Sequence, residues 1–174
     1  FYAGHKNLSL RSAARLLKMA EAERAVLFPE DRIGMMRTIK KIPALLTKQE
    51  SEEIRDTHFI FDSAQVGNIS SDYEGILTQG FQKKREQIRR QMKKFAGDEE
   101  KCEELKAMDV CIDAVELMAK KYREEAMRMG ITELAEALAN VPAKAPESYY
   151  EALVMLRLLN FVLWLNGNKH NTLG

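Results

Sequence analysis

The chain has 174 residues, of which 45% are hydrophobic and 30% are charged. This composition is typical of a globular protein and excludes a largely disordered chain. The 27 basic and 26 acidic residues leave a net charge of +1, so the overall charge gives no support for binding to nucleic acid or to an anionic membrane. The length suits a single domain, and the low content of proline and glycine favours an all-α fold of about six helices.

The first third of the chain is predicted to form three helices separated by turns. Apolar residues at helical spacing indicate a first helix from Asn7 or Ser9 to about residue 27, and a second helix from about 31 to 41. Pro43 ends the second helix. The T-K-Q-E sequence at 47–50 is a capping box and predicts a third, short helix that extends to about residue 56.

The stretch 57–71 has the least regular pattern and is predicted to be a long loop, with a short strand at 58–61. A second capping box, S-D-Y-E at 71–74, predicts a helix to about Ala96, with Gly97 at its C-terminal end. Seven basic residues lie between positions 83 and 94 of this helix. A solvated helix face explains them better than an RNA-binding surface does, because aromatic residues are not interleaved with them.

The longest helix is predicted from Asp98 to about Met129, because apolar residues recur there every three or four positions. Such a stripe is typical of a packing seam between helices. Its members are Cys102, Leu105, Met108, Ile112, Val115, Ala119, Tyr122, Ala126 and Met129. Gly130 then turns the chain into a short helix over 132–140.

The C-terminal helix is the most hydrophobic element of the chain. A capping box formed by Ser148 and Glu151 starts it, and from residue 152 to residue 165 only Arg157 and Asn160 are polar. A helix that is apolar on almost every side belongs inside a larger structure, whereas a run this short with an internal charge is a poor membrane span. The two polar residues share one face, which we expect to meet an absent core or the layer below.

The motifs of common catalytic and metal sites are absent from the sequence. It contains no glycine-rich phosphate loop, no G-x-S-x-G and no H-E-x-x-H, and its three histidines lack partners at metal-ligand spacing. Cys102 and Cys111 are nine residues apart on one predicted helix, so they face opposite ways and are expected to be free thiols. Free thiols without a signal peptide indicate a reducing, cytoplasmic compartment.

Three segments resemble motifs of the glycyl radical enzymes, the pyruvate formate-lyase-like family. Residues 67–80, G-N-I-S-S-D-Y-E-G-I-L-T-Q-G, resemble the family pattern G-H-x-x-x-D-Y-x-x-x-L-x-x-G. Residues 141–153 resemble V-P-x-x-P-x-S/T-F/Y-x-E-A-L. Residues 170–174, H-N-T-L-G, are similar to the start of H-N/S-x-L/S-G-R-F-D-Q. The order and spacing of the motifs agree from about residue 66 to the last residue.

The resemblance implies that residues 1–174 form a single helical unit, the N-terminal layer of a larger enzyme that ends here before its α/β-barrel core. In such an enzyme a radical stored on a C-terminal glycine passes to a cysteine, whose thiyl radical abstracts hydrogen from the substrate. A separate iron–sulfur activase installs the radical with S-adenosylmethionine. The implied partners are the remainder of the parent enzyme, the activase and a second copy in a homodimer, without a membrane or nucleic acid. Because the chain starts with Phe1 rather than methionine, we expect a fragment or a processed chain.

The resemblance implies substrate-binding residues on two segments, but no catalytic or metal-binding residue in this chain. Asn68 stands where many relatives carry a histidine that contributes to the substrate pocket, and Asn168, His170 and Asn171 follow the apolar helix. Loop capping and turn formation explain these residues equally well. An asparagine cannot titrate near neutrality, so a substrate that needs an imidazole at this place is in doubt. The substrate class stays open: an acyl formate, a diol, a quaternary amine or an aryl acetate.

Two other functions remain open on the sequence alone. The chain would be a free-standing protein-interaction or RNA-binding module if the basic helix at 83–94 were its binding surface. It would be a small enzyme only if acid, base or nucleophilic groups converged, and the sequence gives no such set. If the chain is a fragment, it should expose a large apolar patch where its partner elements are absent.

Overall fold

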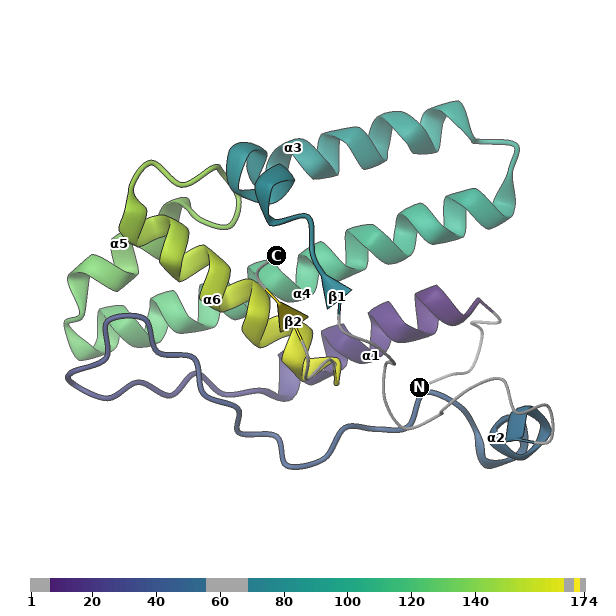
Figure 1. Cartoon of the computed structure of the whole chain (residues 1–174), viewed down its shortest axis with the longest axis horizontal. Coiled ribbons are helices and arrows are strands. Elements are labelled where there is room, and N and C mark those ends of the chain that lie inside the picture. Colours follow the sequence, from purple (N-terminus) through teal and green to yellow (C-terminus); the bar gives the residue numbers. More distant parts are fainter. Residues whose placement is uncertain (1–6, 56–68, 168–170, 173–174) are drawn as a thin grey trace.

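A computed structural model describes residues 7–55, 69–167, 171 and 172. Within these residues it contains six α-helices and one pair of very short strands, so the expected all-α fold is confirmed (Figure 1). The elements in chain order are α1 (Leu8–Ala22), α2 (Lys48–Arg55), β1 (Ile69–Ser70), α3 (Tyr73–Lys94), α4 (Glu99–Met129), α5 (Thr132–Asn140), α6 (Tyr149–Leu165) and β2 (Asn171–Thr172).

The core forms around the C-terminal half of α4, against which α1, α5 and α6 pack (Figure 1). Tyr122 of α4 and Phe161 of α6 are both fully buried, and their rings meet edge to face with centroids 6.0 Å apart. The predicted burial of α6 is confirmed for one face from Val154 to Leu165, where seven residues are buried. None of the described helices is long and apolar enough to cross a membrane.

The predicted seam of α4 is correct only in its C-terminal half. From Ile112 to Ala126 the seam residues are buried, but Met108 is 53% exposed and Leu105 is only half-buried. Helical periodicity shows which residues share a face, whereas burial depends on whether another element covers that face. The N-terminal half of the seam therefore lines an open side of the molecule.

Local capping signals set most helix boundaries. The Thr47 box is complete, since the Thr47 hydroxyl accepts from the Glu50 amide at 3.2 Å and the Glu50 carboxylate accepts from the Thr47 amide at 2.8 Å. Ser148 caps α6 as predicted. The cap of α3 is Asp72 rather than Ser71, because the Asp72 carboxylate accepts from the Gly75 amide at 2.9 Å. That helix ends at Lys94, and its C-terminal cap is Phe95, two residues before the expected Gly97.

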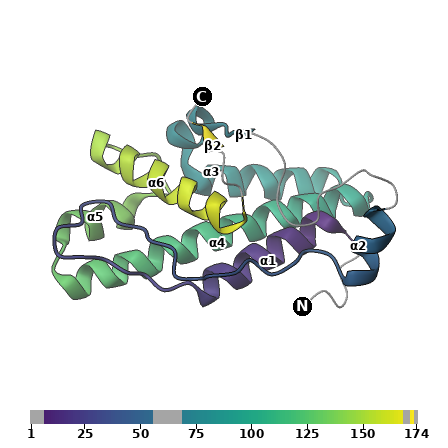
Figure 2. The same cartoon turned by 60° about the horizontal axis from the view of Figure 1, so that its bottom comes forward.

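The helix predicted over 31–41 does not exist. Residues 24–47, named the strap here, contain no helix: they run along the helices towards α5, turn back and return until α2 begins (Figure 2). The first helix also ends earlier than expected, because Glu23 already has extended backbone angles. Gly34 and Met35 both have positive φ, 65° and 74°, which a right-handed helix does not allow.

Polar side chains from outside the strap form hydrogen bonds to its backbone. The Glu23 carboxylate accepts from the amides of Thr38 at 2.6 Å and Ile39 at 3.4 Å. The Tyr122 hydroxyl accepts from the Met36 amide at 2.8 Å and donates to the Met36 carbonyl at 3.1 Å. These bonds replace the hydrogen bonds that a helix would have made within the strap.

Arg157 of α6 also forms hydrogen bonds to the strap. Its guanidinium donates to the carbonyls of Gly34, at 3.3 Å, and of Met35. Of the two contacts expected for Arg157, with an absent core or with the layer below, the structure describes the second: Arg157 contacts the strap of this chain. Its neighbour on the same face, Asn160, is half-buried.

Candidate functional site

The two segments that carry the predicted substrate-binding residues come together through their backbones. Strand β1 pairs in parallel with β2, so that Ile69 lies opposite Asn171 and Ser70 opposite Thr172 (Figure 1). Asn68 immediately precedes β1 in the sequence, and Asn168 and His170 precede β2. The pairing therefore joins two segments from opposite ends of the motif-bearing region.

The structure does not describe the side chains at this junction. Asn68, Asn168 and His170 lie outside the described residues, and for Asn171 only the backbone is placed. Their role in substrate binding accordingly stays a prediction. The short strand predicted at 58–61 also lies outside the described residues.

A second junction joins α3 to the connector, which is the segment 141–148 between α5 and α6. Gly80, with φ 71° and ψ 170°, breaks α3, and the amides that follow it bond to the connector: Phe81 to the Pro142 carbonyl at 2.9 Å and Gln82 to the Ala143 carbonyl at 2.8 Å. A Cβ atom on Gly80 would lie 2.4 Å from the Lys144 carbonyl carbon. Only glycine fits this close approach. The last residue of the first motif and the first residues of the second thus lie in contact.

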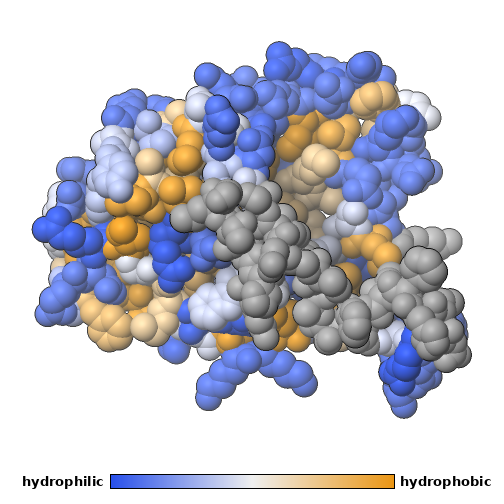
Figure 3. Space-filling model, in the orientation of Figure 1, coloured by the Kyte–Doolittle hydropathy of each residue, from blue (hydrophilic) through white to orange (hydrophobic). Residues whose placement is uncertain are grey.

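Next to the β1–β2 pair, the structure opens into an apolar groove between α1, α3, α4 and α6. We define the apolar groove by Leu16, Ile76, Ile88, Leu105, Met108 and Leu163, and its volume is about 1050 Å³. Apolar side chains form the hollow below α3, between blue hydrophilic rims (Figure 3). Apolar side chains are exposed together at this groove, whereas the large apolar patch expected of a fragment stays a prediction.

Tyr73 lines the same groove and carries an unpaired polar atom. Its side chain is 7% exposed, and its hydroxyl has no hydrogen-bond partner in the described part of the chain. A buried hydroxyl without a partner is costly. The sequence motif contained Tyr73 next to Asp72, but the prediction went to Asn68, because the pattern alone does not show which motif residue is left without a partner.

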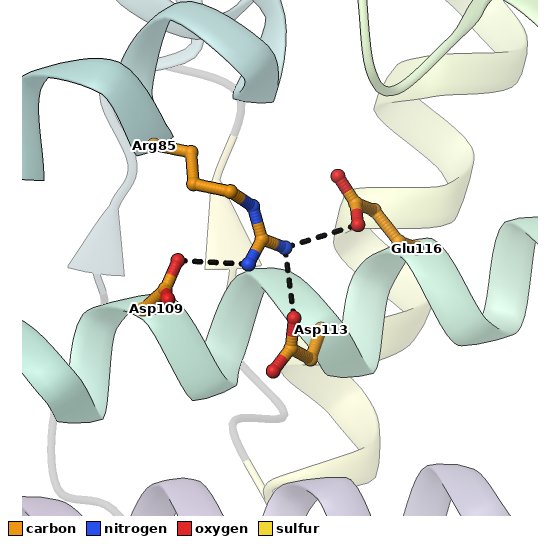
Figure 4. A network of polar contacts seen from close by, with 4 residues as sticks. All are labelled: Arg85, Asp109, Asp113 and Glu116. Carbon is orange, nitrogen blue, oxygen red and sulfur yellow. Dashed lines mark hydrogen bonds and ion pairs between the residues drawn. The ribbon is translucent and has the colours of Figure 1, made fainter. Parts of the chain in front are cut away.

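One basic residue of α3, the helix that carries the basic stretch 83–94, forms ion pairs within the chain. Arg85 donates to Asp109 and Asp113 at 2.8 Å each and to Glu116 at 3.0 Å, all on α4 (Figure 4). Burial alone would lower the pKa of Arg85, but the bond to Asp113 and the charges of Glu116 and Asp109 raise it above its ordinary value. Arg85 therefore joins α3 to α4 and is not offered to a polyanion.

Neither cysteine is arranged as a nucleophile. Both are free, as predicted, and each is half-buried. Burial raises the pKa of the Cys111 thiol, which opposes thiolate formation. The Cys102 thiol donates to the Phe95 carbonyl at 3.1 Å. Within the described residues, no cluster of histidine, cysteine and carboxylate side chains could hold a metal ion.

Comparisons with known proteins agree with the sequence motifs. The family model described as pyruvate formate lyase-like matches residues 36–173. A solved structure entitled "1,2-propanediol Dehydration in Roseburia inulinivorans; Structural Basis for Substrate and Enantiomer Selectivity" has a similar fold, with a TM-score of 0.74 and 16% sequence identity over 94% of this chain. The similarity covers 30% of the length of that structure's chain. No curated protein sequence matches significantly.

The family match includes helices α2 to α6 and the two segments that pair as β1 and β2, whereas α1 precedes it. The family match takes in well over half of the chain. The chain therefore belongs to the pyruvate formate lyase-like family of glycyl radical enzymes.

Proposed function

We propose that this chain is the N-terminal helical unit of a glycyl radical enzyme that cleaves a C–C, C–O or C–N bond by radical chemistry. The observation that carries the proposal is the parallel pairing of β1 with β2, because it joins two motif segments that are far apart in sequence. The unit itself is catalytically silent. Its contribution is to position those two segments against the part of the enzyme that bears the radical.

In this proposal Asn68, Asn168, His170 and Asn171 border the substrate pocket of the complete enzyme. The amides of the asparagines can each donate and accept a hydrogen bond, but they cannot exchange a proton near neutral pH. Their role would be to orient the substrate, while a cysteine outside this chain abstracts the hydrogen atom. The complete enzyme would act in the cytoplasm as a homodimer, after an iron–sulfur activase has used S-adenosylmethionine to install the glycyl radical.

The proposal is tested with the polypeptide encoded by the complete reading frame, incubated without oxygen with an activase and S-adenosylmethionine. We expect an organic radical in the electron paramagnetic resonance spectrum, lost when the glycine of the C-terminal motif is replaced by alanine. The 174-residue chain alone should give no such signal. A reading frame without a glycyl motif, or a complete polypeptide that forms no radical, would refute the assignment.

The site residues need a separate measurement in the activated enzyme. Asn171→Ala and Asn68→Ala should raise KM for the substrate while the yield of glycyl radical stays unchanged. Asn140→Ala is the control, because the Asn140 amide donates to Glu151 and to the Ala145 carbonyl, away from the β1–β2 junction. Unchanged KM in both site variants would assign these asparagines to loop capping alone.

A further inference from the structure

The open side of the molecule is concentrated on α3. This helix has 22 residues but buries three of them, Tyr73, Gly80 and Ile88, whereas the 17 residues of α6 include seven that are buried. The ion pairs of Arg85 join α3 to α4, yet on α4 Met108 is exposed and Leu105 is only half-buried. Two helices fastened in this way leave a space that the rest of the described chain does not fill.

The apolar groove has the dimensions of a polypeptide segment. Its volume of about 1050 Å³ lies just above the range of small-molecule sites, which is roughly 300–1,000 Å³. A helix about 10 Å wide would fill this volume with roughly nine residues, or two and a half turns. The exposed Met108 suits such a contact, because methionine adapts its shape to an incoming apolar surface.

Tyr73 gives an independent indication of an occupant. Its hydroxyl is buried at the groove and unpartnered among the described residues. Native structures pair almost all buried polar atoms, so a buried orphan marks a place where a partner group is to be expected. An incoming segment that carries one acceptor opposite Tyr73 would satisfy it.

We propose that an apolar α-helix from the remainder of the parent enzyme occupies the apolar groove and accepts a hydrogen bond from the Tyr73 hydroxyl. This inference rests on the proposed function. The choice of occupant follows from the fold match, in which the same helical unit makes up 30% of a longer chain. It also follows from the lining, in which apolar side chains predominate and the charged residues are of both signs, Lys84 with Asp72 and Glu104, which does not suit a polyanion.

The first test compares two methionines of α4. Met108 lies in the groove and is 53% exposed, whereas Met127 lies outside the groove and is 62% exposed. Met108→Cys and Met127→Cys are made separately with Cys102 and Cys111 replaced by alanine. In the 174-residue chain both thiols should react with a small alkylating reagent at similar rates. In the complete polypeptide the thiol at position 108 should react at least about tenfold more slowly, because only local opening would expose it, while the control keeps its rate.

The second test uses Tyr73→Phe, which removes only the hydroxyl. In the 174-residue chain the thermal midpoint should stay the same or rise, because a buried unpaired group is lost. In the complete polypeptide the variant should lose about fivefold in its folding equilibrium constant, the value of one ordinary hydrogen bond.

The outcomes separate this inference from the proposed function. If the complete polypeptide forms the glycyl radical but the thiol at position 108 reacts as fast as in the 174-residue chain, the groove inference alone is overturned. Slow reaction at position 108 already in the 174-residue chain would mean that another part of this chain or a second copy fills the groove, and would equally overturn it. Absence of the radical would refute the proposed function first.

Discussion

The strap and the apolar groove differ in whether the polar groups beside them have hydrogen-bond partners within the described chain. On the strap side, the side chains of Glu23, Tyr122 and Arg157 form hydrogen bonds to the backbone of the strap. On the groove side, Met108 stays largely exposed and the Tyr73 hydroxyl has no partner in the described chain. The difference indicates that one side is completed by this chain and that the other is prepared for a surface that the described residues do not supply.

The sharpest test of this contrast replaces one methionine on each side in the 174-residue chain. Met35 of the strap is 1% exposed, and Met35→Ala should lower the free energy of unfolding by about 2–5 kcal/mol, since it leaves a cavity. Met108→Ala should cost less than about 1 kcal/mol, because this side chain is already half in solvent. Urea denaturation measures both. Equal losses would remove the distinction between the two sides.

The second prediction concerns the attachment of α3 on the groove side. Gly80→Ala should destabilise the chain by roughly 2–3 kcal/mol, because it combines strain at positive φ with a clash against the Lys144 backbone. Gly97→Ala is the matched control, since no atom lies within 4 Å of the added methyl group. Thermal unfolding compares the two. If Gly80→Ala is as stable as the control, the contact between α3 and the connector does not fix the helix.

The third prediction removes one hydroxyl from each side. Tyr122→Phe leaves the amide and carbonyl of Met36 without their partner and should cost about 1–3 kcal/mol in unfolding free energy. Tyr73→Phe should change the same quantity by less than about 0.5 kcal/mol or increase it, because no bond among the described residues is lost. A comparable loss in both variants would show that Tyr73 has a partner within the chain.

The smallest expected effect is a pH dependence that arises in the groove. Burial raises the pKa of the Cys111 thiol in the folded chain, so folding favours the protonated form. Its contribution to stability is fully present below the ordinary cysteine pKa of about 8.5 and is lost as the pH rises through the higher folded value.

The measurement compares wild type with Cys111→Ala by urea denaturation at pH 8 and at pH 10. Wild type should lose more stability than the variant over this interval, by less than about 1.4 kcal/mol per pH unit, the limit for a single proton. Parallel losses in the two proteins would show that the thiol remains accessible to solvent in the folded state.

Most helices of this fold could be predicted because their signals are local. The capping residues Thr47, Asp98 and Ser148 each lie within one turn of the helix that they start, and the sequence showed them directly. The strap could not be predicted in this way. Its conformation depends on Tyr122 and Arg157, which lie more than eighty positions further along the chain.

The site was predictable in part for related reasons. The motif segments were identified by sequence, but a pair of two-residue strands is too short to leave a pattern, so their parallel pairing came only from the structure. The exposure of Met108 was equally hidden, because a periodic stripe does not show which element covers it. The break at Gly80 could have been suspected from the sequence, because a glycine within a helical pattern weakens the helix.

The junction at Gly80 has a wider consequence when it is taken together with β1 and β2. Strand β1 leads into α3, and main-chain hydrogen bonds join α3 to the connector. The connector leads into α6, and β2, which follows α6, pairs with β1. This path is a closed circuit whose two crossings are made by peptide groups. Since peptide groups are the same at every position, most side chains along the circuit can change while its geometry is kept, whereas position 80 requires glycine. A fold shared at 16% identity is the result that such a circuit would allow.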